Sequence, residues 1–290
     1  MAEMASIQWF PGHMTKTRRM IQANLSLVDG VVEILDARIP MSSRNPEMDR
    51  LVKNKPRMLL LNKADMADDK ATEKWSEYYR NKGFTVLKAD CKSGNGLKSF
   101  LPAVKNKMLK ELMDRRREKG IEGAPIRLMI VGIPNVGKSS FINRMSKSKK
   151  AKVEDRPGVT RTKQWIKFGE NVEMLDMPGV LWPKFEDQSV ARKLAFTGAV
   201  KDDILDIEAL ASFLLENLAV NSPQAIEQRY KFTPEGEGYE MLQMLGRKRG
   251  MLISGGEVNT ERAAITLLDE YRSGKLGRIT LEQPSEVENE

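Results

Sequence analysis

The residues with the clearest chemistry lie in the run Gly132-Ile133-Pro134-Asn135-Val136-Gly137-Lys138-Ser139. Two glycines separated by four residues let successive backbone N–H groups turn inward around an anion. The Lys138 ammonium can reach the outer phosphates of a nucleotide, and the Ser139 hydroxyl can take one position on a magnesium ion. The spacing therefore predicts a phosphate-binding loop.

The residues on either side of this loop predict the elements that would position it. The apolar run from Ile126 to Val131 has the length and composition of a buried strand, and Ser139 to Met145 can begin a helix. A phosphate loop needs this order of strand, loop and helix. The context therefore strengthens the prediction from the motif.

A second polar run, Asn62-Lys63-Ala64-Asp65, follows the apolar strand predicted at Met58 to Leu61. In an open parallel sheet, ligand-binding loops lie at the carboxyl ends of strands. The Asp65 carboxylate could accept hydrogen bonds from N1–H and the exocyclic amine of guanine, which adenine does not offer. The Lys63 stem could cover the base, and the Asn62 amide could tie this loop to the phosphate loop. The alternative is a polar loop that ends in an aspartate helix cap.

A third loop, Asp90-Cys91-Lys92-Ser93-Gly94-Asn95-Gly96, follows the strand predicted from Phe84 to Ala89. It would support the same base through the backbone near Cys91 and through the stem of Lys92. Nothing beside Cys91 suggests an activated thiolate, so we interpret it as a small packing residue.

The segment after the phosphate loop has the features of a two-part switch. From Arg144 to Lys167 there are nine lysines and arginines against two acids. Within it, Thr160 could reach magnesium and a terminal phosphate when nucleotide is bound. After a strand predicted at Val172 to Leu175, Asp176 could hold the magnesium through water, and the Gly179 amide could sense the terminal phosphate.

Composition limits the class of protein. The chain has 290 residues, 40% of them apolar, which suits about two domains with a real core. One cysteine and one histidine exclude an internal disulfide and leave too few ligands for a zinc site. We expect a cytoplasmic protein with no membrane insertion, because no apolar run approaches about 20 residues. The net charge of +8 and pI near 9.4 favour a nucleic-acid partner over a merely soluble surface.

Helical patterns dominate the part after Gln188, whereas strands alternate with helices before it. The predicted helices are Ala191 to Phe196, Ile207 to Leu218, Pro223 to Tyr230, Gly238 to Leu245 and Thr260 to Tyr271. In the earlier part we predict helices at Thr15 to Leu27, Lys70 to Lys82 and Leu97 to Lys119, and a strand at Val31 to Leu35 that ends in Asp36-Ala37-Arg38. The expected boundaries are 1–187 for the α/β domain, 188–281 for a helical domain and 282–290 for a disordered acidic tail.

Within the helical part, Arg247-Lys248-Arg249 is flanked by Gly246 and Gly250. We predict an exposed basic turn that could contact RNA phosphates.

Taken together, these elements resemble the GTP-binding proteins, but in an unusual order. Asn62 to Asp65 precedes Gly132 by about seventy residues, whereas in the common order the phosphate loop comes first. A parallel sheet tolerates such a circular permutation if its strands keep their neighbours. The resemblance is closest to the bacterial YlqF-type ribosome biogenesis GTPases (ribosome biogenesis GTPase A). It is carried by Gln8-Trp9-Phe10-Pro11-Gly12-His13-Met14 and by Asp176-Met177-Pro178-Gly179, and it weakens only after Glu282.

This resemblance implies an α/β fold, a circularly permuted P-loop GTPase domain with a C-terminal all-helical domain. It implies hydrolysis of GTP to GDP and phosphate with Mg²⁺, stimulated by the ribosomal subunit and by K⁺. The implied role is late maturation of the large (50S) ribosomal subunit, with the GTP state bound to the precursor and its rRNA, and release on hydrolysis. Off the ribosome the chain would be a monomer.

The resemblance also implies roles for particular residues. Val180 stands where many GTPases carry a water-orienting glutamine, so hydrolysis must use another polar group. The family implies His13 for this role, as the catalytic residue that moves toward the terminal phosphate. Asn135 would help to bind potassium, or would merely brace the loop. The expected nucleotide contacts are Asn62, Lys63, Ala64, Asp65, Asp90, Cys91, Lys92, Pro134, Asn135, Val136, Gly137, Lys138, Ser139, Ser140, Thr160 and Gly179, and the expected magnesium ligands are Ser139, Thr160 and, through water, Asp176.

Two other classes of function remain open from the sequence. The first is a regulatory GTP switch with a protein partner and no ribosomal role, for which binding would depend less steeply on salt. The second is an ATP-dependent kinase or transferase that uses the same phosphate loop. The run Asn62 to Asp65 argues against the second.

Overall fold

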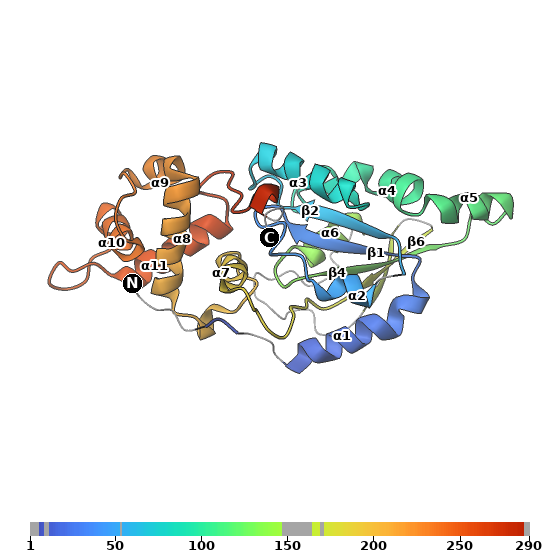
Figure 1. Cartoon of the computed structure of the whole chain (residues 1–290), viewed down its shortest axis with the longest axis horizontal. Helices are drawn as coiled ribbons and strands as arrows, with labels where there is room; N and C mark the ends of the chain where they lie inside the picture. Colours follow the sequence, from blue (N-terminus) through green and yellow to red (C-terminus); the bar gives the residue numbers. More distant parts are fainter. Residues whose placement is uncertain (1–5, 9–11, 53, 147–163, 169–170, 287–290) are drawn as a thin grey trace.

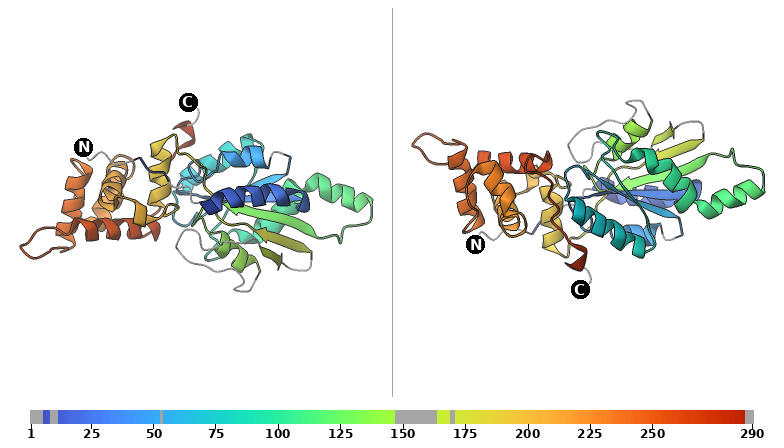
Figure 2. Two further views of the ribbon diagram at one scale, coloured as in Figure 1. Left: turned by 90° about the horizontal axis from the view of Figure 1, so that it is seen from below. Right: turned by 90° about the horizontal axis from the view of Figure 1, so that it is seen from above.

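The computed structural model describes residues 6–8, 12–52, 54–146, 164–168 and 171–286. Within this part of the chain, a sheet with helices around it lies at one end of an elongated molecule, and a group of helices lies at the other (Figure 1). Two further views show the same separation, with helix α7 (Gln188–Phe196) between the two parts (Figure 2).

Six strands form one sheet in the order β3-β2-β1-β4-β6-β5. The pairs from β3 to β6 are parallel, and β5 runs antiparallel to β6. The register pairs Asp36 with Asn62 and Ile130 with Asp176, so the ends of β1, β2, β4 and β6 meet at one edge of the sheet. This edge is where the predicted loops must lie. The strands are β1 (Gly30–Asp36), β2 (Arg57–Asn62), β3 (Thr85–Lys88), β4 (Ile126–Gly132), β5 (Gln164–Phe168) and β6 (Val172–Asp176).

Helices cover both faces of the sheet. On one face, Trp75 and Tyr79 of α3 (Asp69–Asn81) pack in a buried cluster with Leu59 and Leu61. On the other, the rings of Phe100 and Phe141 meet edge to face with centroids 5.0 Å apart. The remaining helices of this part are α1 (Gly12–Asn24), α2 (Glu47–Leu51), α4 (Phe100–Ala103), α5 (Lys110–Glu118) and α6 (Lys138–Met145), with 3₁₀ turns at Leu25–Leu27 and Leu97–Ser99.

The helix predicted from Leu97 to Lys119 is wrong as one continuous element. After α4 the chain makes a π-helical turn, Val104–Met108, and the Leu109 N–H bonds to the Val104 carbonyl, 2.8 Å away. Met108 and Leu109 are both buried. A regular helix turns neighbouring residues about 100° apart, whereas the wider turn brings both against the sheet. The short α2 was not predicted, because five residues carry too little periodicity.

The second part of the structure is helical, as the sequence predicts. It contains α7, α8 (Ile207–Asn221), α9 (Pro223–Tyr230), α10 (Gly238–Lys248) and α11 (Thr260–Arg272), with a 3₁₀ turn at Asp202–Ile204. Helices α8 to α11 begin at the predicted residues. The Asp206 carboxylate and the Asn259 amide accept bonds from first-turn N–H groups, which fixes the starts of α8 and α11. The Asp187 carboxylate does the same for α7, which begins three residues before the predicted Ala191. None of the described helices is long and apolar enough to cross a membrane.

The chain returns from α11 to the sheet, which corrects the expectation of a disordered tail for residues 282–286, whereas residues 287–290 lie outside the described part of the structure. Glu282 is 1% exposed, and its carboxylate accepts bonds from the backbone N–H of Met41 and Ser42. A further 3₁₀ turn follows at Pro284–Glu286. A carboxylate with this many donors is held in place, whereas composition alone suggests a solvated acidic end.

Candidate functional site

The loop between β4 and α6 has the backbone of a phosphate-binding loop. Gly137 has φ of +101°, and a Cβ there would lie 2.2 Å from Nδ2 of Asn62. Only glycine suits this position, because the conformation is left-handed and the space is already filled. Helix α6 starts at Lys138 and is eight residues long. Its first-turn N–H groups have no partner within the helix and favour an anion.

Lys138 and Asp176 form a buried pair of opposite charges at this loop. Lys138 is 7% exposed, and its ammonium donates to the carbonyls of Gly132, at 3.3 Å, and Ile133, at 2.9 Å. Burial lowers the pKa of Lys138 to about 8, and the charge of Asp176 opposes this shift. Burial raises the pKa of Asp176 to about 6, and Lys138 opposes that shift. Both shifts arise because water is excluded from the charged group.

One oxygen of Asp176, Oδ1, is buried and has no hydrogen-bond partner among the described residues. An unsatisfied buried carboxylate oxygen is costly unless a ligand completes its bonding. A magnesium ion binds oxygen ligands and keeps several waters, one of which could donate to this oxygen. The half-buried Ser139 hydroxyl lies in the first turn of α6. The residues present therefore fit a magnesium ion.

The Asn62 amide joins the phosphate loop to the second and third loops. Its Nδ2 donates to the carbonyl of Val136, 2.7 Å away, and its Oδ1 accepts from the backbone N–H of Cys91, at 2.9 Å. Asn62 is 3% exposed. The predicted link between the phosphate loop and the run Asn62 to Asp65, which we call the base loop after its predicted role, is confirmed.

The second loop, Asn62 to Asp65, is held at the sheet edge by Lys63. Lys63 has φ of +60°, and its ammonium lies 2.9 Å from the Asp36 carboxylate. The Ala64 N–H donates to the carbonyl of Ala89, 3.2 Å away. Asp65 is exposed. The sequence analysis assigned no role to Asp36, although the polar run Asp36-Ala37-Arg38 at the carboxyl end of β1 was a signal that could have found it.

The third loop is closed by its own side chain and backbone. The Asp90 carboxylate accepts from the N–H groups of Lys92, at 2.8 Å, and Ser93, at 3.1 Å. Cys91 is 1% exposed in the main core, and burial raises the pKa of its thiol far above the ordinary value. A buried neutral thiol is a packing group, as predicted.

The segment after β6 lies against the phosphate loop. A Cβ on Gly179 would lie 2.9 Å from the backbone nitrogen of Pro134 and 3.2 Å from Nζ of Lys138. The Val180 N–H donates to the carbonyl of Gly132, 3.3 Å away, and Val180 is 1% exposed. The structure thus brings Gly179 to the loop and buries the side chain that follows it.

Asn135 links the phosphate loop to the helical part. Its Nδ2 donates to the carbonyl of Gly198, which follows α7, at 2.7 Å. Asn135 and Lys63 are two of the three described non-glycine residues with left-handed backbone, and such strain is typical of functional loops. Ser140 lies half-buried beside Ser139 in α6. Thr160 and the His13 side chain lie outside the described part of the structure, although the His13 backbone belongs to α1.

The run Arg247-Lys248-Arg249 is exposed, as predicted, but the prediction of a turn is wrong for its first two residues. Arg247 and Lys248 are the last residues of α10. Arg249 lies over the Tyr230 ring, 5.3 Å from its centroid, and 3.4 Å from the Glu270 carboxylate. Arg249 is exposed like Arg247 and Lys248, and its guanidinium pairs with a carboxylate of α11.

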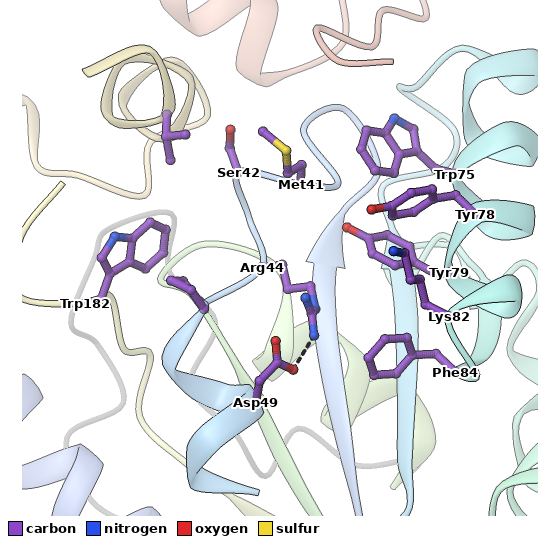
Figure 3. A pocket seen from close by; sticks show the side chains of 12 residues that line it. Met41, Ser42, Arg44, Asp49, Trp75, Tyr78, Tyr79, Lys82, Phe84 and Trp182 are labelled. Atoms are coloured by element: carbon purple, nitrogen blue, oxygen red, sulfur yellow. Dashed lines mark hydrogen bonds and ion pairs between the residues drawn. The ribbon is translucent and has the colours of Figure 1, made fainter. Parts of the chain in front are cut away.

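A separate open groove of about 560 Å³ lies over α3 and contains none of the predicted nucleotide residues. Figure 3 shows Trp182 on one side, Tyr78, Tyr79 and Phe84 on the other, and Arg44 between them. Trp182 follows Gly179 by three positions, so one wall of the groove continues from the segment at the phosphate loop.

Comparisons with known proteins agree with this geometry. A family model described as "50S ribosome-binding GTPase" matches residues 127–231. Ribosome biogenesis GTPase A of Priestia megaterium is 48% identical over 98% of this chain and 99% of its own length. The protein of the same name from Bacillus cereus is 46% identical, over 97% and 95%. The crystal structure of GNP-bound YlqF from T. maritima has a TM-score of 0.68 at 28% identity, covering 93% of this chain and 98% of its own.

These relatives are GTPases, so the ATP-dependent kinase or transferase is no longer supported. Their similarity extends over both the sheet and the helical part, and it confirms the predicted α/β fold with its permuted order of loops. The chain therefore belongs to the ribosome biogenesis GTPase A family, the YlqF-type circularly permuted GTPases.

Proposed function

We propose that this chain is a GTP hydrolase that acts in late assembly of the large ribosomal subunit. The observation that carries the proposal is the meeting of three loops: Asn62 bonds to the phosphate loop, and Lys138 and Asp176 are buried together beside it. The names of the relatives and of the matching family supply the ribosomal part of the proposal.

In the proposed complex, the loop N–H groups and Lys138 hold the phosphates. Asp65 accepts from guanine N1–H and the exocyclic amine, and the stems of Lys63 and Lys92 flank the base. Ser139, and Asp176 through water, would hold a magnesium ion, which would supply positive charge against the phosphate oxygens. Asn135 would help to hold a potassium ion beside the phosphates.

The water-orienting role falls to His13 in this proposal. Val180 is apolar and buried, so it offers no hydrogen bond to an attacking water. GTP would order the segments around Thr160 and Gly179, and the ordered surface would bind the immature particle. Hydrolysis would release it. Arg247 and Lys248 would contact rRNA phosphates, and the chain would act in the cytoplasm as a monomer when off the ribosome.

The test is GTP turnover in potassium buffer with and without large ribosomal subunits. Small subunits and sodium buffer serve as controls. We expect stimulation by large subunits alone and loss of the stimulation in sodium. Equal turnover in all conditions would contradict the ribosomal role. A protein partner would then be favoured if binding also showed a shallow dependence on salt.

A second test concerns His13. His13→Ala should slow stimulated hydrolysis while GTP affinity stays nearly the same, because a water-orienting group acts mainly in the transition state. Single-turnover rates and equilibrium binding separate the two effects. If affinity collapses while the rate per bound nucleotide survives, His13 is structural.

A further inference from the structure

The segment that follows α11, residues 274–282, runs back along the edge of the sheet that carries the base loop. We call this segment the strap. The Ile279 N–H donates to the carbonyl of Met66, and the Leu281 N–H donates to the carbonyl of Arg38, at 2.9 and 2.8 Å. Ile279 and Leu281 are buried. Figure 1 shows the short turn that follows the strap, Pro284–Glu286, in red beside α3 and β2.

Arg278, in the strap, donates hydrogen bonds to the base loop and to the residues that follow it. Its Nη2 donates to the carbonyl of Ala64, at 2.8 Å, and its Nε donates to the carbonyl of Ala67, at 2.9 Å. The same guanidinium pairs with the Asp69 carboxylate at the start of α3. The two carbonyls stand on either side of Asp65, the residue assigned to guanine. A planar, rigid fork of donors fixes such a pair of acceptors better than a single ammonium could.

The other end of the base loop is connected to the helical part through buried charges. Lys63 pairs with Asp36, and Asp36 binds the Arg38 guanidinium through two bonds of 2.9 and 2.8 Å. Arg38 is 1% exposed and also donates to the carbonyl of Tyr271, near the end of α11, at 3.1 Å. The base loop is therefore held on both sides of Asp65 by groups that depend on where α11 and the strap lie.

We propose that the strap and the end of α11 position the guanine-specifying loop, with Arg278 as the positioning residue. Arg278 acts through the Ala64 and Ala67 carbonyls, and it fixes the direction of the Asp65 carboxylate toward the base. Selectivity for guanine nucleotides is then a property of the helical part and the sheet part together. This inference rests on the proposed role of Asp65.

The test compares equilibrium affinities for GDP, IDP and ADP, measured by calorimetry with the full chain and magnesium. IDP lacks the exocyclic amine of guanine, and ADP depends on the phosphate contacts. We expect Arg278→Ala to weaken GDP binding about tenfold, which corresponds to about 1.4 kcal/mol. IDP binding should weaken less, because one of its two bonds to Asp65 is already missing, and ADP binding should not change. The ratio of GDP to IDP affinity should therefore fall.

Three variants make the test specific. Lys275→Ala removes an exposed cation from the same strap and should leave all three affinities as in the wild type. Arg278→Lys keeps the charge near Asp69 but cannot bridge two carbonyls, so it should behave like Arg278→Ala. Asp65→Asn removes the carboxylate itself and gives the ratio expected when guanine is not recognised. Arg278 is exposed, so its replacement leaves the core intact, and thermal unfolding checks this.

Two results would overturn the inference. The first is an equal loss of GDP, IDP and ADP affinity in Arg278→Ala, which would make Arg278 a general structural residue. The second is full recovery in Arg278→Lys, which would make charge rather than the two-carbonyl grip responsible. A different failure, a wild type that does not prefer GDP to ADP, would instead reject the assignment of Asp65 and with it the proposed function.

Discussion

The Asn62 side chain bonds to two segments that are far from it in the sequence, at Val136 and Cys91. Both bonds are buried and both partners are backbone groups. If the amide is removed, the Val136 carbonyl and the Cys91 N–H lose their hydrogen-bond partners. Water cannot easily replace the lost bonds, because both groups are buried. A single amide therefore determines how the base loop and the phosphate loop lie relative to each other.

Asn62→Ala should lower the free energy of unfolding by about 2 to 4 kcal/mol, because two buried backbone groups are left unsatisfied. Urea unfolding of the nucleotide-free protein measures this. Asn221→Ala is the matched control: its amide bonds only to Asn217 on the exposed end of α8, and the change should stay within about 0.5 kcal/mol. Equal losses of unfolding free energy in the two variants would contradict the conclusion that the Asn62 amide joins the two loops.

Asp36→Asn should be destabilising in a way that depends on pH. Burial by itself would raise the pKa of the Asp36 carboxyl, but Arg38 and Lys63 hold it well below its usual range. At pH 7 we expect a loss of about 3 to 5 kcal/mol, because two cations lose a buried partner.

The sign of the pH dependence follows from the lowered pKa of Asp36. The charged Asp36 carboxylate contributes its full stabilisation above the pKa of the unfolded state, which is about 3.9. This contribution is lost as the pH falls toward the lower pKa of the folded state. The difference in unfolding free energy between the wild type and Asp36→Asn should therefore become smaller below about pH 4. Urea unfolding between pH 3 and pH 7 measures it, and a difference that stays constant would contradict the account.

Motif spacing predicted the phosphate loop, the base loop and the bond from Asn62, because each follows from local chemistry that recurs at fixed spacing. It could not predict that Lys63 pairs with Asp36 or that Asn135 bonds to Gly198. Those partners depend on which loops the finished fold brings together. The same limit applies to Arg249, whose partner Glu270 lies on another helix.

At the scale of elements, helix starts were more predictable than helix continuity. Asp206 and Asn259 are local N-cap signals, and α8 and α11 begin directly after them. The π-helical turn at Val104–Met108 has no comparable local signal, since it is selected by the sheet against which Met108 and Leu109 pack. Propensity and periodicity describe one element, whereas packing involves two.

Gly238, at the start of α10, lies where α10 approaches α8 closely. A Cβ on Gly238 would lie 2.3 Å from the Ser212 carbonyl oxygen of α8. Because that atom belongs to the backbone, the helices must separate, and Gly238→Ala should cost about 1 to 3 kcal/mol in unfolding free energy. Gly123→Ala is the control, since nothing lies within 4 Å of its added Cβ. Similar stabilities of the two variants would show that α10 moves without cost.

At the scale of the whole molecule, the sheet part and the helical part are joined at several places. Asn135 bonds to Gly198, Arg38 bonds to Tyr271, and the strap returns to the sheet. Composition and periodicity indicate two parts and their boundary, but they do not show that the second part folds back onto the first. Because of that return, the run Asn62 to Asp65 is held by residues from both parts.

Leu281→Ala tests how much the packing of the strap contributes to the free energy of unfolding. Leu281 is 5% exposed in the main core, so the truncation should cost about 2 to 5 kcal/mol. Leu252→Ala carries the same change at a side chain that is 52% exposed and should cost much less. Denaturant midpoints of the two variants give the comparison. A strap that contributes little to folding would give similar midpoints.

The strap also sets an order of events during synthesis. Arg278 and its acceptor Ala64 are 214 positions apart, whereas β1, β2 and β3 follow one another in the chain and lie side by side in the sheet. At roughly 5 to 20 residues per second, the base loop emerges about 10 to 40 seconds before the residue that grips it. During that interval the nascent chain carries the run Asn62 to Asp65 without the hydrogen bond from Arg278. If Arg278 positions Asp65 as proposed, selectivity for guanine nucleotides would be complete only after the helical part has been made.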